Sequence, residues 1–501
     1  MSVIQVAPQR RQANRWLCVL AWAGLSVAGA ALAGLVAGEL VVAGRTIAVL
    51  ALATAVLPIA LWRRPALAPA LLVVLATTVE QYPYTVGPYN GAFTDHIPLF
   101  TGIGSAHVNP ADLLFISMLL TWVLKLATGE ANGWPRSAVG VAVSALLGAV
   151  FLGLLVGVMH HGDLRTSFLE VRPYIYLALA FVLTTALVAT KDAIRAVLWG
   201  LVLGSGFKAC QGIELFLRAR HLRPRPDAVL GHEEAYFFGV FVFLTLAMWL
   251  FGVRGRLRTV ATVLFPLVLV ADLVNSRRTA WLILGAGLLV LMVIGSVCLR
   301  EQRKVLAALA ILGAALAAVY IPAYWNHTGS LAQPARAVHS IVSPDARDAS
   351  SDLYRKQENA NLKLNVRQAK LIGKGFGVPI DYALPIVNIS SIDPLIAYIP
   401  HDGVYYVIMR MGVLGGIAFW SLIGLGVIGA CRLARAKDRE LACVGASVAC
   451  ALVAYLFQGY NDQGFFFYRI AFVTGVLLGL GECASRLSRE NDATLSHADA
   501  R

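Results

Sequence analysis

Charged residues are scarce in this chain. Aspartate, glutamate, lysine and arginine make up 14% of its 501 residues, against about 25% in an average soluble protein. This scarcity excludes an ordinary water-soluble globular protein of the same size. Apolar residues take their place, because 58% of the chain is hydrophobic and the mean hydropathy is +0.70.

Cysteine is also scarce. The chain has seven cysteines, none of them in the long polar segment 323–402 and no two at CxxC spacing. This pattern argues against a disulfide framework and against a cysteine metal site. Two clusters of histidine and acidic residues, at 160–163 and 232–234, lack the i, i+4 spacing of paired metal ligands on a helix. We therefore predict no metal and no cofactor, and interpret these histidines as loop-surface residues.

Acidic residues are fewer than basic ones, 28 against 42, which gives a net charge of +14. In a soluble protein such an excess would suggest nucleic acid. Here no basic patch is interleaved with stacking aromatic residues, so we predict no nucleic-acid partner. The basic residues gather instead in short segments between apolar runs, as in the cytoplasmic loops of membrane proteins.

The apolar runs predict an all-α, polytopic transmembrane bundle, because about 20 apolar residues cross a bilayer as one helix. We predict about fourteen spans. They lie near residues 17–37, 41–61, 66–79, 111–128, 138–159, 174–190, 194–213, 234–252, 258–274, 280–298, 304–322, 403–430, 441–458 and 466–483. The first run is too long for the apolar region of a signal peptide, so we interpret it as a retained helix.

Positive charge predicts the orientation, because Lys and Arg accumulate in cytoplasmic loops. Basic segments occur near residues 10–15, 63–64, 125–136, 191–195, 254–258, 300–304, 432–439 and 486–489. They alternate with the remaining loops, which places both termini in the cytoplasm. The predicted units are spans 1–11 within 1–322, an outward loop domain 323–402, spans 12–14 within 403–483, and a cytoplasmic tail 484–501.

The predicted outer loops carry charge against this rule. Nine of the ten histidines fall there, and so do several arginines: Arg165, Arg172, Arg218, Arg220, Arg223, Arg225, Arg277 and Arg278. An anionic ligand at the outer face is the simplest explanation.

Arg277 and Arg278 give the most specific signal among these arginines, since they follow Ser276 in a very short outer loop between two spans. They are either snorkelling interfacial residues or a bidentate clamp for a phosphate or diphosphate. Arg172 precedes the sixth predicted span and either pairs with Glu170 or adds to the same anion site.

The long polar segment has its own pattern. Residues 323–350 are rich in Pro, Gly, Ser and Ala and are predicted to be irregular. Residues 351–372 predict a helix that starts at Ser351-Asp352 and carries an apolar stripe of Leu353, Ala360, Leu364 and Leu371. A glycine-rich turn at 373–377 ends it. His401 and Asp402 close the segment, and a histidine there is either a proton carrier near neutral pH or a loop-closing residue.

Three motifs, in this order, resemble the bacterial O-antigen ligase and polymerase family of membrane glycosyltransferases. Ser276-Arg277 opens a span, Arg355 leads a helix that ends in Gly-x-Gly, and His401 is followed after ten residues by Gly412. The match covers roughly residues 230–430.

The chain departs from that family's pattern at a few positions. Asn359 stands where the family usually has tryptophan, Asp402 stands where Asn or Ser is common, and no proline precedes the Gly-x-Gly. Arg278 makes a double arginine, of which Arg277 better fits the Ser-Arg order.

The resemblance implies a GT-C-like fold in the bacterial inner membrane with the active site facing the periplasm. It implies metal-independent, inverting transfer of a glycan from undecaprenyl diphosphate to a glycan or lipid A core acceptor. His401 would be the general base. Arg277, Arg278, Arg172 and Arg355 would hold the diphosphate or glycan, and Asp402 would orient His401 or contact sugar hydroxyls.

Several functions stay open at this point. A polysaccharide or O-antigen polymerase is favoured, because the chain and its spans exceed those expected of a compact ligase. An O-antigen ligase acting on lipid A core is the alternative, and polysaccharide export proteins are possible partners. A lipid-linked oligosaccharide flippase is the alternative from another class. It would need charged residues inside its spans, and few are predicted here.

Overall fold

The computed structural model describes residues 61–82, 86, 93–97, 99–100, 109–131, 133–222, 226, 228–327, 329–390 and 394–499. Its longer elements are α-helices. They are α3 (Leu67–Thr78), α4 (Pro110–Ala127), α5 (Ala138–Met159), α6 (Leu164–Leu187), α7 (Lys191–Ala219), α8 (Glu234–Leu250), α9 (Arg256–Asn275), α10 (Arg278–Cys298), α11 (Arg303–Ala323), α12 (Gln333–Val342), α13 (Ala346–Ala369), α14 (Gly403–Leu433), α15 (Arg439–Asn461) and α16 (Tyr468–Asp499).

Within these ranges, ten helices are long and apolar enough to cross a bilayer. Two more, α3 and α8, are apolar but shorter, with 12 and 17 residues. The prediction of an all-α, polytopic membrane bundle is confirmed at this level. The first two predicted spans lie, except for residue 61, outside the described residues.

Most predicted spans coincide with helices to within a few residues, and α5 matches its prediction at both ends. The main deviation is α6, which begins at Leu164 rather than near residue 174. Asp163 caps it by accepting a hydrogen bond from the Thr166 amide at 2.7 Å. The hydropathy pattern missed this first part because Arg165, Glu170 and Arg172 interrupt the apolar run. The predicted tail from 484 is also helical, because α16 continues to Asp499.

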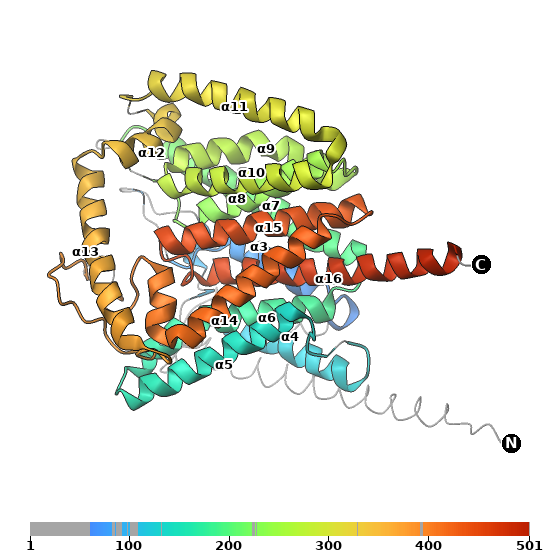
Figure 1. Ribbon diagram of the computed structural model, residues 1–501, viewed down its shortest axis with the longest axis horizontal. Coiled ribbons are helices and arrows are strands. Elements are labelled where there is room, and N and C mark those ends of the chain that lie inside the picture. Colours follow the sequence, from blue (N-terminus) through green and yellow to red (C-terminus); the bar gives the residue numbers. More distant parts are fainter. Residues whose placement is uncertain are drawn as a thin grey trace.

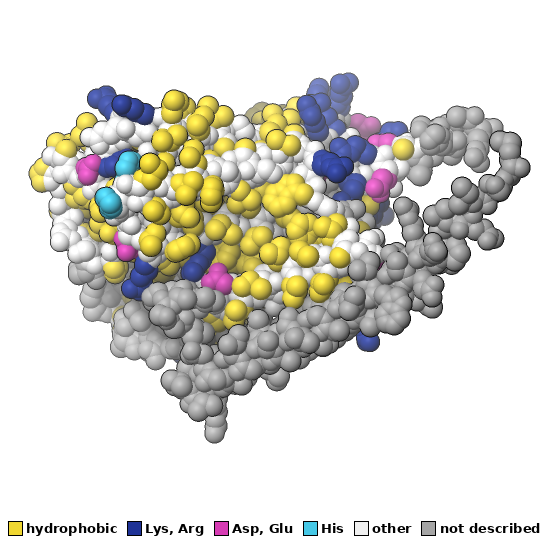
Figure 2. Space-filling view, turned by 90° about the horizontal axis from the view of Figure 1, so that it is seen from below, with side chains coloured by type: hydrophobic (Ala, Val, Ile, Leu, Met, Phe, Trp, Pro, Cys, Tyr) yellow, Lys and Arg dark blue, Asp and Glu magenta, His cyan; other side chains and the backbone are white. Residues whose placement is uncertain are grey.

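Figure 1 shows the spanning helices side by side with similar directions, while α13 runs across their ends at one end of the bundle. We call this end, which carries α12 and α13, the loop face. The end of α16 at the C-terminus lies on the opposite side of the bundle. Figure 2 shows apolar side chains over the middle of the visible face and charged side chains toward its two ends, as expected for a bilayer-facing surface.

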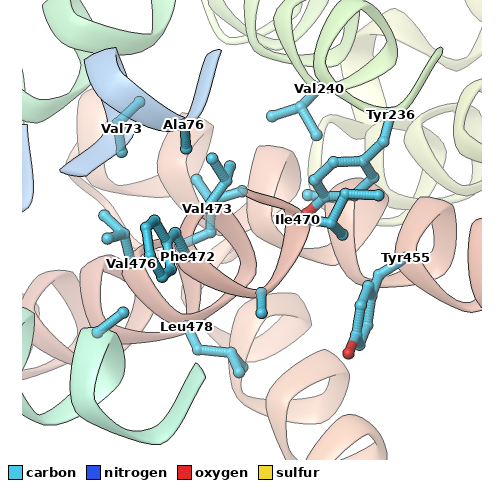
Figure 3. Close-up of a cluster of buried hydrophobic side chains, with 14 of the residues drawn as sticks. Val73, Ala76, Tyr236, Val240, Tyr455, Ile470, Phe472, Val473, Val476 and Leu478 are labelled. Atoms are coloured by element: carbon cyan, nitrogen blue, oxygen red, sulfur yellow. The ribbon is translucent and has the colours of Figure 1, made fainter. Parts of the chain in front are cut away.

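The core is built around α16. Figure 3 shows its apolar side chains between α3 on one side and α8 on the other, with Val73 and Tyr236 on those neighbours. Gly475 and Gly479 of α16 let α6 approach closely, because a Cβ at Gly475 would lie 2.3 Å from the Leu177 carbonyl oxygen. Such a small-xxx-small pattern is a common packing device between membrane helices.

The segment 323–402 has more helix than the prediction allowed. Residues 330–342, predicted to be irregular, form a short 3₁₀ turn and α12. Pro334 lies in the first turn of α12, where its missing N–H is not needed. The following helix, α13, starts at Ala346 instead of 351 and ends at Ala369 instead of 372.

The apolar stripe predicted for this helix is wrong. Leu353 and Leu371 are 56% and 63% exposed. The buried residues of α13 are Glu358, Asn361, Leu362, Asn365 and Ala369, and the two asparagines pair with the backbone of residues 381–384. Each amide donates to one carbonyl oxygen and accepts from one N–H of that segment, at 2.8–3.0 Å.

The glycine turn after α13 inserts into a break in α14. The break lies at Gly412, whose φ of 67° is left-handed, and a Cβ there would lie 2.2 Å from a carbonyl oxygen of the turn. Backbone bonds across the break replace those that the helix loses: the Lys374 amide donates to the Met409 carbonyl at 2.8 Å and the Val413 amide donates to the Lys370 carbonyl at 3.1 Å. The turn therefore attaches the end of α13 to α14, and His401 lies two residues before the start of α14.

Arg410 completes this attachment from inside α14. Its side chain forms an ion pair with Glu170 of α6 at 2.6 Å, and neither side chain is exposed. It also donates to the carbonyl oxygens of Gly375 at 3.0 Å and Tyr398 at 2.8 Å. Of the two alternatives given for Arg172, pairing with Glu170 is therefore contradicted: Arg410 is the partner of Glu170, and it lies in a predicted span.

Candidate functional site

A cavity of about 830 Å³ opens at the loop face. Side chains from α7, α10, α12, α13 and the end of α15 line it. Its cationic residues are Arg220, Arg277, Arg278, Arg336, Arg355, Lys356 and Lys363, and its acidic residues are Asp352 and Asp462. This excess of positive charge suits an anionic ligand.

Arg277 reaches the cavity from the sharp turn between α9 and α10. Ser276 ends α9 in the left-handed conformation, and Arg277 is the N-cap of α10. The guanidinium donates to the Leu230 carbonyl oxygen at 2.9 Å and lies 2.9 Å from Nε2 of His232. Both contacts hold the head group at the cavity wall in a defined orientation.

His232 connects Arg277 to Asp462. Because a guanidinium can only donate, Nε2 of His232 accepts from Arg277, and Nδ1 carries the proton that it donates to the Asp462 carboxylate. Burial acts to raise the pKa of Asp462, but His232 and then Arg355 and Arg277 outweigh it and lower the pKa to about 2. His232 therefore links Arg277 to Asp462 through two hydrogen bonds and does not form a metal-binding cluster with the acidic residues that follow it in the chain.

The helix α13 supplies one wall of the cavity. Asp352, Arg355, Lys356, Asn359 and Lys363 all line it, and their i, i+3, i+4, i+7 and i+11 spacing places them along one side of a helix. Arg278 faces this wall, with its Nη1 4.0 Å from Asp352. The structure thus brings together three of the predicted anion-binding arginines from two separate segments.

His401 is not among the residues that line this cavity, but it contacts Tyr354 and Glu358 of α13, the helix that forms one cavity wall. Its Nδ1 is 3.2 Å from both carboxylate oxygens of Glu358, and its backbone amide donates to the same carboxylate at 3.1 Å. Glu358 is fully buried, the His401 side chain is 23% exposed, and the Tyr354 ring packs edge-on against the imidazole. With Nδ1 directed to Glu358, Nε2 is the nitrogen left to exchange a proton.

Asp402 is the N-cap of α14, and one of its carboxylate oxygens accepts from the amides of Val404 at 2.9 Å and Tyr405 at 3.2 Å. Burial raises the pKa of Asp402, the two backbone amides oppose the rise, and the nearby Glu358 adds to it. The Asn359 amide of α13 also lies beside this carboxyl. The two positions that depart from the resembled family, 359 and 402, are therefore neighbours in space.

Arg172 lies apart from the other predicted site residues. It borders a second cavity of about 160 Å³, which shares no lining residue with the first. Its guanidinium is 3.4 Å from Asp112 and lies over the Tyr468 ring. The structure therefore does not bring Arg172 to the arginine cluster.

Sequence reasoning missed Glu358 and Asp462, the two carboxylates that hold the site histidines. The sequence signal for Glu358 is its i, i+3, i+7 spacing with Asn361 and Asn365, which places the three on one face of a helix. The structure buries all three. Asp462 had no such signal, since its partner His232 is far away in the chain.

No protein-family model matches the sequence, and a search of curated proteins finds no match. The assignment of function therefore depends on the chemistry of the site and on the motif resemblance.

Proposed function

We propose that the protein is a membrane glycosyltransferase. It transfers a glycan from undecaprenyl diphosphate to an acceptor glycan, as a polysaccharide or O-antigen polymerase. The observation that carries the proposal is the cavity at the loop face, where seven cationic side chains meet only two acidic ones. The loop face is then the periplasmic side of the inner membrane, because the basic segments 254–258 and 300–304 adjoin the opposite ends of α9 and α10.

The arginines act on the donor. Transfer breaks the bond between the anomeric carbon and the diphosphate oxygen, and negative charge develops on the leaving diphosphate. Arg277, Arg278 and Arg355 can neutralise this charge through paired hydrogen bonds. Arg277 needs little reorganisation to do so, because His232 and the Leu230 carbonyl already orient it.

His401 acts on the acceptor. Glu358 accepts a hydrogen bond from Nδ1–H, so that Nε2 can take the proton of the acceptor hydroxyl. The hydroxyl oxygen then attacks the anomeric carbon from the face opposite the diphosphate, which leaves with the electron pair, and the configuration inverts. The buried Glu358 carboxylate stabilises the imidazolium that forms, as in other histidine–carboxylate pairs. Asp402 supports His401 by starting α14 directly after it.

The flippase alternative requires charged residues in the bundle, and several are there. Lys208 pairs with Glu80, and Arg469 pairs with Glu234 at 2.7 Å and lies 3.6 Å from Glu233. Arg469 and Glu234 lie in the first turns of α16 and α8 at the loop face. These charges satisfy one another near one end of the bundle, which favours a structural role over a transport path.

A reconstituted reaction tests the proposal. Purified protein in liposomes, supplied with undecaprenyl-diphosphate-linked repeat units, should lengthen the glycan and release undecaprenyl diphosphate. His401→Ala should slow both by about 10²-fold or more, while His327→Ala, at an exposed loop histidine outside the site, should not. Absence of released undecaprenyl diphosphate with active, folded protein would contradict the proposal.

The accumulated product in a deletion strain separates the related functions. A polymerase predicts loss of polymer with single-repeat products. A ligase acting on lipid A core predicts full-length chains left on the lipid carrier. Glycan trapped inside the cell would identify a flippase and overturn the enzyme assignment.

A further inference from the structure

The helix α12 has two chemically different sides. Val338, Ile341 and Val342 are 38%, 70% and 71% exposed, and their spacing places them on one face. Gln333, Arg336 and Ser340 lie on the other face and line the cationic cavity. A ten-residue helix with this division is strongly amphipathic.

The apolar face of α12 continues a bilayer-facing surface. The helix packs against α10 and α11, two helices long and apolar enough to cross a membrane. On α11 almost nothing is buried, and Leu309, Leu316 and Val319 are all exposed. Exposing large apolar side chains to water is unfavourable. Contact with acyl chains removes this cost for α11 and α12 alike.

The cavity reaches this same surface. Ile341 of α12 and Leu282 of α10 both line it, and they are 70% and 37% exposed. On this side the cavity rim is therefore apolar, whereas the wall formed by α13 is charged. A ligand with an anionic head group and a long apolar chain would match both parts.

We propose that α12 is an in-plane membrane helix whose apolar face binds the acyl chains of the adjacent leaflet. Together with α10 it forms a lateral portal through which the apolar chain of a polyprenyl lipid extends from the cavity into the bilayer. Arg336 on the opposite face then meets the anionic head group. The identity of this lipid rests on the proposed function, but the position of α12 in the membrane does not.

The membrane position is tested with an environment-sensitive fluorophore in the full chain in liposomes. A nitrobenzoxadiazole label is attached at Val342→Cys, Ile341→Cys or Val387→Cys, and the unsubstituted chain is labelled as a blank for its native cysteines. Val387 is a matched control, because it is 67% exposed but lies in the irregular segment after the glycine turn. Lipids with a nitroxide high on the acyl chain should quench positions 341 and 342 at least twofold more than 387. Equal quenching by the nitroxide lipids at all three positions, together with equal quenching of 342 and 387 by water-soluble iodide, would overturn the in-plane position of α12.

The portal is tested with donors of two chain lengths. Ile341→Glu and Val342→Glu should raise the KM for an undecaprenyl donor, and this rise should be at least tenfold larger than the rise in KM for a donor with a short, water-soluble isoprenoid. Val387→Glu should change neither KM. An equal rise of both KM values would overturn the portal. If the unsubstituted protein transfers no glycan at all, the proposed function fails, while the fluorescence experiment still decides where α12 lies.

Discussion

Two arginines at the loop face, Arg410 and Arg277, show opposite uses of the same side chain. Arg410 is fully buried, pairs with Glu170 at 2.6 Å and donates to backbone carbonyl oxygens of the segments it joins. Arg277 shares its cavity with other cationic residues, and its contacts include the Leu230 carbonyl oxygen and Nε2 of His232. Arg410 is paired with one buried carboxylate, whereas the cavity that Arg277 lines has seven cationic side chains and two acidic ones.

The different surroundings of the two arginines indicate a structural role for Arg410 and a ligand-binding role for Arg277. A buried, neutralised arginine has no remaining attraction for a ligand, and removing it leaves an uncompensated charge. An arginine held in place among like charges is costly for the fold and useful to an anion. Substitutions at the two positions should therefore have different consequences, and four predictions test this contrast.

The largest effect is expected from Arg410→Ala. It leaves Glu170 buried without its partner, which typically costs about 3–5 kcal/mol of the free energy of unfolding. Thermal unfolding in detergent, followed by tryptophan fluorescence, should show a large loss of stability or no folded protein. Arg432→Ala, at an exposed position near the other end of α14, should change stability by less than about 0.5 kcal/mol. An unchanged melting temperature for Arg410→Ala would show that the pair does not hold α6 to α14.

His401→Ala is expected to lower kcat by about 10²–10⁴-fold, the usual contribution of general acid–base catalysis. The substitution also removes the side-chain partner of the buried Glu358, while the bond from the His401 backbone amide remains. We therefore expect a moderate fall in melting temperature, and kcat is compared on folded protein. Glu358→Gln should give a smaller loss and shift the pH–rate profile, since it removes the charge that stabilises the imidazolium. Full transfer by His401→Ala in the reconstituted assay would refute the role of His401.

Arg277→Lys is expected to keep the fold and weaken donor use. Lysine cannot hold the Leu230 carbonyl and His232 while presenting a planar pair of donors. The loss of one charge-assisted hydrogen bond, about 1.5–3 kcal/mol, corresponds to roughly a 10–150-fold fall in kcat/KM for the lipid diphosphate. Arg367→Lys, at an exposed α13 position outside the cavity, is the matched control. If Arg277→Lys and Arg367→Lys have the same kcat/KM, Arg277 does not bind the donor, and it differs from Arg410 only in burial.

The smallest effect is expected from Asp402→Asn and depends on pH. Because the pKa of Asp402 is raised in the folded protein, its contribution to stability is present below the unfolded value of about 3.9 and is lost as pH rises through the folded value. Asparagine keeps the N-cap and removes this titration. The variant should therefore gain stability relative to the unsubstituted chain as pH rises from 4 to 7. The test is to measure the melting temperatures of both proteins across this pH range. If the two plots of melting temperature against pH are parallel, the prediction is contradicted.

Much of the fold was predictable because a span is a local property. An apolar run of sufficient length crosses the bilayer whatever it packs against, so α5 and α14 begin at the predicted residues. The prediction failed where charge and helix coincide. The first part of α6 contains Arg165, Glu170 and Arg172, and only a partner elsewhere in the chain makes a buried glutamate acceptable there.

The candidate site was predictable in its residue types and not in its assembly. The arginines at 277, 278 and 355 were identified from topology and motif, and the structure gathers them around one cavity. Arg172 had the same sequence signal but lies at another cavity, because Asp112 holds it there. Sequence position alone does not say which of several arginines at one end of a bundle will meet.

By itself the sequence determined that the chain is a helical membrane protein, where most spans lie, and that a polar segment ending in His401 separates two groups of spans. The tertiary structure alone decided that α12 and α13 form the cavity walls, that Glu358 holds His401, and that Arg410 holds Glu170. The reason is physical: transfer of an apolar run into lipid depends on the run's own composition, whereas burying a charge depends on a partner that only folding brings near.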